Sequence, residues 1–143
     1  MDYPDDDPNE PWASAFARIA RTHPKVRDVM KRIEAYFKGD LKTSFAAIPT
    51  PAGPPFYHRC WNTCRRIKPG TTISYAELAE RSGSPMASRA AGQAMRNNPV
   101  PIIVPCHRII GHNGHLGGFS GSNAPSSVHL QLKRGLLDFE STR

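Results

Sequence analysis

The sequence predicts a mostly helical α+β domain that contains a helix-turn-helix and one short β element. Three observations lead to this prediction. Apolar residues recur at helical spacing in several short segments, 11 glycines and 14 prolines separate those segments, and a tight Gly-Ser turn joins two of the helices. The chain of 143 residues has room for one such domain. Its many chain breaks exclude a coiled coil, a solenoid and a long helical bundle.

Charge is distributed unevenly along the chain. Residues 1–10 hold five acidic residues and no basic one, so residues 11–143 carry nineteen basic and seven acidic residues, a net charge of +12. So basic a segment favours an anionic partner, most often nucleic acid. The alternative is a basic surface that only keeps the protein soluble.

The apolar runs are too short to span a membrane, and the sequence shows no secretion signal, so we expect a soluble protein that is not exported. The three cysteines have no disulfide-type spacing, which predicts reduced thiols.

Two segments precede the body of the domain. Residues 1–24 are acidic and contain prolines but no sustained apolar period, which predicts a disordered tail. A helix ended by Gly39 is predicted next, because apolar residues recur at helical spacing at Val26, Met30, Ile33 and Phe37. The prolines and the glycine within residues 40–54 indicate a linker.

A second helix is predicted over residues 55–67, with an apolar stripe of Phe56, Cys60, Cys64 and Ile67. The dipeptide Pro69-Gly70 ends it. Cys60 and Cys64 lie one helical turn apart, which could indicate a metal site, but packing in the core is the preferred interpretation and no metal site is predicted. Residues 71–73 could form a short strand.

Two short helices joined by a tight turn follow. The sequence Ser74-Tyr75-Ala76-Glu77 is a capping box, which predicts a helix that begins at Tyr75 and is closed by Gly83. Ser84-Pro85 supplies an N-cap and a first-turn proline, which predicts a further helix that lasts to about Asn97. Together the two helices have the outline of a helix-turn-helix.

The second of these helices is rich in small residues, namely Ala90, Ala91, Gly92 and Ala94. A helix with such a bare face can approach another surface closely, and Arg89 and Arg96 supply positive charge beside it. Tight packing within the core explains the small residues equally well, so the helix alone does not decide between the two interpretations.

The candidate chemistry lies in residues 98–110, Asn98-Pro99-Val100-Pro101-Ile102-Ile103-Val104-Pro105-Cys106-His107-Arg108-Ile109-Ile110. The prolines at 99 and 101 predict an extended chain, followed by a buried apolar run. Pro105 suits the first position of a short helix, which places Cys106 in a first turn whose dipole and amides favour a thiolate. His107 cannot face its neighbour on a helix, so we expect a water to carry the thiol proton. The alternative is a buried, inert cysteine beside a surface histidine.

Pro105-Cys106-His107-Arg108, with Ile109-Ile110 after it and Asn98-Pro99-Val100-Pro101 before it, resembles the active-site signature of the O(6)-alkylguanine-DNA alkyltransferases, also called methylated-DNA–protein-cysteine methyltransferases. The similarity covers residues 55–140, and a weaker similarity extends over residues 26–41. It includes further motifs in the same order, which are Ile73-Ser74-Tyr75-Ala76-Glu77-Leu78-Ala79, the Arg89 helix, Gly117-Gly118-Phe119-Ser120-Gly121, and Lys133-Arg134-Gly135-Leu136-Leu137 as far as Glu140.

This resemblance implies a winged-helix-like domain that repairs DNA by direct reversal, without a cofactor. Cys106 would take the alkyl group from O(6) of guanine irreversibly, with His107 activating it through a water and Glu140 orienting the imidazole. Tyr75 would protonate or hydrogen-bond the leaving guanine and crowd the target phosphate, and Asn98 would brace the turn that presents the cysteine. The base pocket implied by the resemblance consists of Cys106, Ile109, Ser120, Phe119 and Met95.

The resemblance also implies how DNA is bound. A thiol in a pocket cannot reach a base inside a duplex, so the base must be flipped out, and Arg89 matches the family's intercalating finger. The small residues would let the helix enter the minor groove, where the degenerate code suits repair with little sequence preference. The implied DNA-binding residues are Ser88, Arg89, Ala90, Arg96 and Tyr75. We expect a monomer that binds double-stranded DNA containing O(6)-alkylguanine, in the nucleus of a eukaryote or the cytoplasm of a prokaryote.

Some features depart from the family pattern. Residues 25–54 would be only a remnant of a larger N-terminal domain, residues 55–140 the alkyltransferase domain and residues 141–143 a tail. The segment 122–131 is longer than the pattern, Gly135 stands where tryptophan is common, and Phe119 stands where tyrosine often sits.

Two other classes of protein compete with the repair enzyme. Non-catalytic alkyltransferase-like proteins recognise damaged DNA with the same fold, but they resemble Pro-Trp-His-Arg at the key motif, and Cys106 argues against that class. A helix-turn-helix regulator would not need the Pro-Cys-His-Arg pocket.

Overall fold

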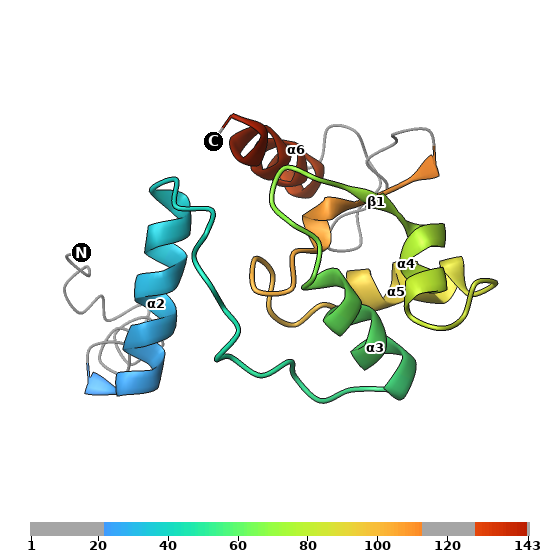
Figure 1. Cartoon of the computed structure of the whole chain (residues 1–143), viewed down its shortest axis with the longest axis horizontal. Helices are drawn as coiled ribbons and strands as arrows, with labels where there is room; N and C mark the ends of the chain where they lie inside the picture. The colour runs from blue at the N-terminus through green and yellow to red at the C-terminus, as the bar shows by residue number, and fades with distance from the viewer. Residues whose placement is uncertain (1–21, 113–127, 143) are drawn as a thin grey trace. The chain divides into compact units, whose positions relative to one another are not determined.

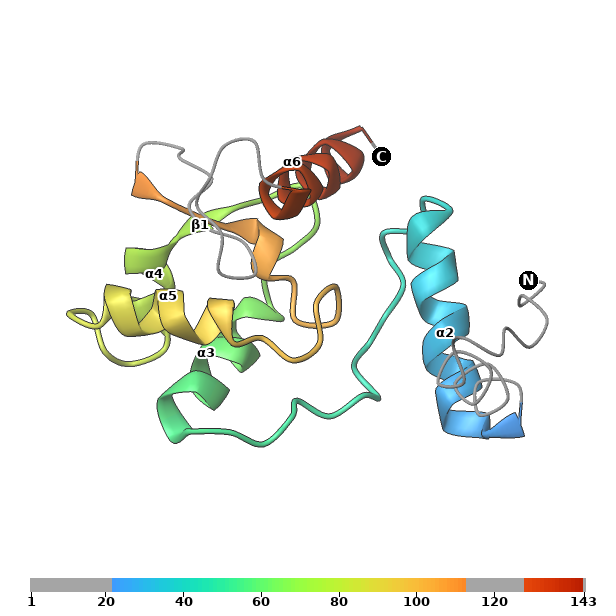
Figure 2. The same ribbon diagram turned by 180° about the vertical axis from the view of Figure 1, so that it is seen from behind.

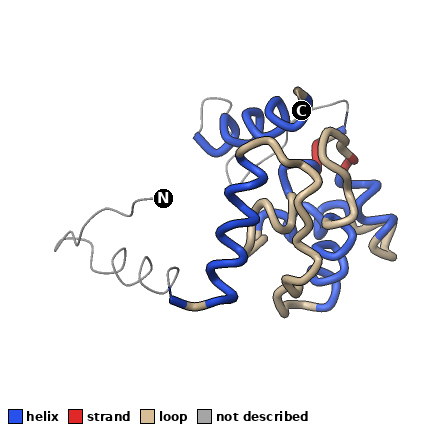
Figure 3. The backbone as a smooth tube through the Cα atoms, turned by 60° about the vertical axis from the view of Figure 1, so that its left-hand side comes forward, coloured by secondary structure: helices blue, strands red, loops and turns tan. Residues whose placement is uncertain are grey.

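A computed structural model of the chain describes residues 22–112 and 128–142 (Figure 1). The chain divides into two compact units, Met1–Ile48 and Pro49–Arg143. This division falls inside the predicted linker, while most of the predicted disordered tail lies outside the described residues. Helices predominate in the described residues and the strands are short, as Figure 3 shows, which confirms the predicted fold class. None of the described helices is long and apolar enough to cross a membrane.

The first unit contains α2 (Pro24–Phe37), which begins with a proline in its first turn, where the missing N–H is not needed. Gly39, at a φ of 104°, follows its end as predicted. The predicted apolar stripe is wrong at its last position, because Tyr36 is buried and Phe37 is 51% exposed. These residues lie three and four positions after Ile33, on nearly the same face of a helix, so helical spacing does not choose between them.

The second unit has its core between α3 (Pro55–Cys64), α4 (Tyr75–Arg81) and α5 (Ser88–Arg96), which Figure 2 shows from behind. Cys60 and Cys64 are fully buried in this core. The ring of Trp61 joins α3 to α5, because its Nε1 donates to the carbonyl of Ala94 at 2.8 Å. The helix ends three residues before the predicted position 67, and Ile67 is buried in the turn that follows it.

The start of α4 confirms the predicted cap, since the amide of Glu77 donates to Oγ of Ser74 at 3.1 Å. The way in which α4 ends explains why the prediction that the next helix, α5, begins at Ser84-Pro85 is wrong. Gly83, at a φ of 95°, donates to the carbonyl of Glu80, and the amide of Ser84 donates to Ala79, which completes a Schellman motif. Ser84 thereby belongs to the end of α4. A separate turn from Ser84 to Ala87 then precedes the first residue of α5, Ser88.

The β element consists of β1 (Ile73–Ser74) and β2 (Ile109–Ile110), which pair in parallel with Ile73 opposite Ile109. The predicted strand over residues 71–73 therefore overlaps β1 only at Ile73. Between them in sequence lie α4, α5 and the one-turn 3-10 helix η1 (Cys106–Arg108), and α6 (Val128–Ser141) follows. The pairing brings Tyr75, directly after β1, beside the chain that follows Cys106.

Candidate active site

The chain that leads to Cys106 is folded around the side chain of Asn98. Its Nδ2 donates to the carbonyl of Val104 at 2.7 Å, and its Oδ1 accepts from the amide of Val100 at 3.0 Å. The amide of Val104 in turn donates to the carbonyl of Val100 at 2.9 Å. The prediction of an extended segment is therefore wrong here, because the chain turns back at Ile102. That β-branched residue has a φ of 74°, a strained backbone conformation which the surrounding bonds maintain.

Cys106 begins η1 and is buried in the core of the second unit. Burial raises the pKa of its thiol, and Asn98 and Lys133 oppose that rise only in part. The amides of Cys106 and His107 do lower the pKa of this thiol, as the predicted first turn implies, but burial has the larger effect and the pKa is raised overall. The resting group is a thiol that needs a base.

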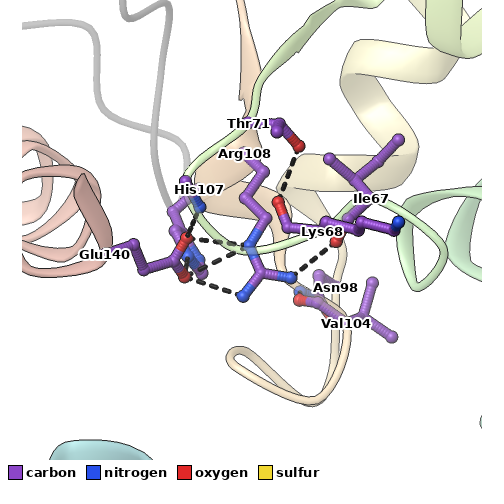
Figure 4. A network of polar contacts seen from close by, with 9 residues as sticks. Ile67, Lys68, Thr71, Asn98, Val104, His107, Arg108 and Glu140 are labelled. Carbon is purple, nitrogen blue, oxygen red and sulfur yellow. Dashed lines mark hydrogen bonds and ion pairs between the residues drawn. The ribbon is translucent and has the colours of Figure 1, made fainter. Parts of the chain in front are cut away.

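The side chain of His107 points to Glu140, as Figure 4 shows, and both are buried. Its Nε2 is bonded to Oε1 of that carboxylate. Because a carboxylate only accepts hydrogen bonds, we assign the proton of the neutral ring to Nε2, which leaves Nδ1 as the basic nitrogen. Burial lowers the pKa of His107, and Glu140 opposes this. The alternative of a surface histidine does not hold, since His107 is 1% exposed.

Glu140 also accepts hydrogen bonds from Arg108, a partner that the sequence did not reveal. Arg108 donates from Nε to Oε2 at 2.9 Å and from Nη2 to Oε1 at 2.8 Å. The amide of Gly70 donates to Oε2 at 3.2 Å. The carboxylate at the end of α6 is therefore held from η1 and from the loop before β1 at once.

Lys133 is the second functional candidate that sequence reasoning missed. It is 0% exposed, and its Nζ donates to the carbonyl of Ile109 at 2.7 Å and to the hydroxyl of Tyr75 at 3.4 Å. Burial lowers the pKa of Lys133 to about 8 and raises the pKa of Tyr75 to about 12. Helical spacing was the signal that could have found it, because Leu130, Lys133 and Glu140 share the buried stripe of α6.

The buried ammonium leads to a prediction about stability. Lys133 titrates near pH 8 in the folded chain and near its ordinary 10.5 when unfolded, so the unfolded chain binds more protons between these values. The free energy of unfolding should therefore rise with pH from about 8 to about 10, by about 2 kcal/mol, relative to a Lys133→Met variant. Urea unfolding across this range measures the difference. The exposed Lys68, replaced in the same way, is the control, and parallel pH curves for wild type and Lys133→Met would contradict the prediction.

The residues predicted to bind DNA lie at the start of α4, where Tyr75 is half-buried, and along α5. Ser88, Arg89 and Arg96 are exposed on α5, and Ala90 is half-buried. Two of the small residues proposed to enter the groove, Ala91 and Ala94, are instead fully buried in the core, because they lie on the opposite face of α5. The packing interpretation is correct for these two. Gly92 is half-buried, and a Cβ added there would make only an ordinary contact, 3.9 Å from the ring of Tyr75.

The residues predicted to line the base pocket are only partly described. Cys106, Ile109 and Met95 are buried in one core cluster, against which Tyr75 packs. Phe119 and Ser120 lie outside the described residues.

Comparisons with known proteins identify the family. A family model described as 6-O-methylguanine DNA methyltransferase, DNA binding domain, matches residues 55–142. A methylated-DNA–protein-cysteine methyltransferase of Methanosarcina acetivorans is 42% identical over 116 residues, which are 81% of this chain and 69% of that protein.

Solved structures show the same relationship. The crystal structure of the Mycobacterium tuberculosis O6-methylguanine methyltransferase superposes with a TM-score of 0.69 at 37% identity, covering 82% of this chain and 67% of that one. A crystal structure of the Mycobacterium tuberculosis OGT in complex with DNA superposes with a TM-score of 0.64 at 34% identity, covering 82% and 68% of the two chains. The chain therefore belongs to the family of the methylated-DNA–protein-cysteine methyltransferases and contains their DNA-binding domain.

Proposed function

We propose that this chain repairs DNA by moving an alkyl group from O(6) of a modified guanine to Cys106, once per molecule. The observation that carries the proposal is the grouping of Cys106, His107 and Glu140 in one buried site. The first two are adjacent in η1, and Glu140 reaches His107 from α6, 33 residues further along the chain. An alkyl carbon bound to oxygen requires a soft nucleophile, and a thiolate is one.

The reaction begins with the proton of the Cys106 thiol. Because burial raises the pKa of this thiol, the thiolate has to be formed at the moment of reaction, with His107 as the base. The proton moves to Nδ1 of His107 through a bridging water, since neighbouring residues of a helical turn do not face each other. Glu140 keeps the ring oriented and stabilises the imidazolium that results.

The sulfur then attacks the alkyl carbon. An S–C bond forms as the bond between that carbon and O(6) breaks, and its electron pair leaves with the guanine. Tyr75, whose pKa burial raises to about 12, stays protonated and donates a hydrogen bond to a ring nitrogen of the leaving base. The guanine finally takes up a proton from solvent, in balance with the proton that His107 accepted. A stable thioether remains on Cys106, so the reaction is not repeated.

Double-stranded DNA containing O(6)-alkylguanine is the proposed partner. The exposed arginines of α5, Arg89 and Arg96, support this, together with the similarity to a protein solved in complex with DNA. The buried position of Cys106 requires the base to leave the stack before it can react.

Replacing Arg89 by alanine should slow repair of duplex DNA by about 10- to 100-fold while leaving the reaction with free benzylguanine within about 2-fold, because the side chain that replaces the flipped base is lost. Single-turnover rates on the two substrates measure this. Arg66→Ala, which removes an exposed arginine outside α5, is the control. Equal losses on duplex and free base would assign Arg89 a structural role only.

The proposed function itself is tested by incubating the chain with a duplex that contains one O(6)-methylguanine. Mass spectrometry is expected to find one methyl group on the peptide that contains Cys106 and an unmodified guanine in the DNA. Tight binding of the methylated duplex without transfer would favour the non-catalytic damage-recognition class. Binding that depends on sequence but not on methylation would favour a regulator.

A further inference from the structure

Arg108 is a buried charged group at the site that the reaction described above does not use. It is 7% exposed, and two of its nitrogens donate to the two oxygens of Glu140. Its Nη1 donates to the carbonyl of Ile67, a bond drawn in Figure 4, at 2.7 Å. A planar guanidinium that meets both oxygens of a carboxylate fixes its orientation and compensates its charge.

The carboxylate of Glu140 is shared between Arg108 and His107. Its Oε1 accepts from both, and its Oε2 accepts from Arg108 and from the amide of Gly70. A buried carboxylate without a compensating cation favours the charged form of a histidine beside it. An imidazolium already holds its second proton and cannot accept the proton of a thiol. The charge balance around Glu140 therefore shifts His107 toward or away from the neutral form that can act as a base.

We propose that Arg108 is a positioning residue for alkyl transfer: it orients Glu140 and compensates its charge, so that His107 remains neutral until it receives the proton of Cys106. This inference rests on the proposed function. The step transfers one proton in net terms, from the sulfur of Cys106 through the bridging water to Nδ1 of His107. Arg108 keeps all its protons and acts through Glu140.

The other charged and titratable groups around His107 act in known directions. Among the described residues these groups are Arg108 from η1, and Glu140 and Lys133 from α6. Burial lowers the pKa of His107 most, Glu140 raises it, and Arg108 and then Lys133 lower it. Loss of the guanidinium removes one of the effects that oppose Glu140 and leaves burial and Lys133, so the pKa of His107 should rise.

The test compares Arg108→Met, Arg108→Lys and the wild type in single-turnover transfer from a methylated duplex across pH. The rate of the wild type should fall toward acid pH as His107 becomes protonated. In Arg108→Met this fall should begin about one pH unit higher than in the wild type. In the pH range where the rate is falling, the variant should therefore transfer the methyl group about 10-fold more slowly, while at alkaline pH its rate should return to that of the wild type. Arg108→Lys keeps the charge but loses the planar fork, and its shift should be about half as large. The exposed Arg66, replaced by methionine, is the control.

Two further measurements keep the inference falsifiable if Arg108→Met unfolds. The double variant Arg108→Met/Glu140→Gln leaves no unpaired charge. Its transfer rate should begin to fall toward acid at the same pH as that of the wild type or at a lower pH. NMR titration of His107 in protein with ¹³C-labelled histidine reports the same shifts without DNA. A rate lowered equally at every pH, or an unmoved titration of His107 in Arg108→Lys, would overturn the inference. A wild type that transfers no methyl group would overturn the proposed function, while the titration still decides whether Arg108 controls the protonation of His107.

Discussion

Replacing Cys106 by serine is expected to lower the rate of alkyl transfer by about 1000-fold or more, which in practice abolishes it. The affinity for alkylated DNA should stay within about 3-fold of that of the wild type. A serine hydroxyl is a far weaker nucleophile than a thiol near neutral pH, and the pair of His107 and Glu140 cannot offset that difference. Serine is nearly isosteric with cysteine, so the turn that Asn98 stabilises before Cys106 and the helix η1 should keep their structure. Quantitation of O(6)-methylguanine remaining in the duplex measures transfer, and a gel-shift titration measures binding.

The other two cysteines provide the matched controls. Cys60→Ala and Cys64→Ala remove buried thiols from the same core but leave Cys106 in place. Both variants should accept one methyl group, although each cavity will lower stability. Continued transfer in Cys106→Ser, with the methyl group on another residue, would show that the nucleophile lies elsewhere and that the proposed reaction is wrong.

Replacing Glu140 by glutamine should slow transfer by about 10- to 1000-fold, the range expected when the residue that orients a catalytic histidine is lost. Glutamine keeps the shape of the side chain but cannot stabilise an imidazolium. Because Glu140 raises the pKa of His107, its loss should also move the acid fall of the rate to lower pH, opposite to the shift expected for Arg108→Met. Single-turnover rates across pH measure both effects.

Stability has to be followed in the same variant, because Arg108 is left buried without its carboxylate. Removing one partner of a buried ion pair costs about 3 kcal/mol or more, so the rates should be compared at a temperature where thermal unfolding shows a folded protein. Asp138→Asn, an exposed change on the same helix, is the control. An unchanged rate and pH profile in folded Glu140→Gln would leave the carboxylate with a structural role only.

Features that depend on neighbouring residues could be predicted from the sequence. The cap at Ser74 and the glycine that closes α4 are local signals, and both are present. The mostly helical class with a short β element was predicted as well. The motif around Cys106 and His107 led to the correct family, because the two residues are adjacent in the chain. The resemblance also named Glu140, which the structure brings against His107, although its role stays a prediction.

Features that depend on distant contacts needed the tertiary structure. Sequence periodicity does not show that Arg108 compensates Glu140, nor that the ammonium of Lys133 is buried beside Tyr75, because these partners lie tens of residues apart. The same holds for the parallel pairing of Ile73 with Ile109. The resting state of Cys106 is the clearest case. Local amides favour a thiolate, but desolvation depends on everything packed around the sulfur, and only the folded chain shows that burial is the larger effect.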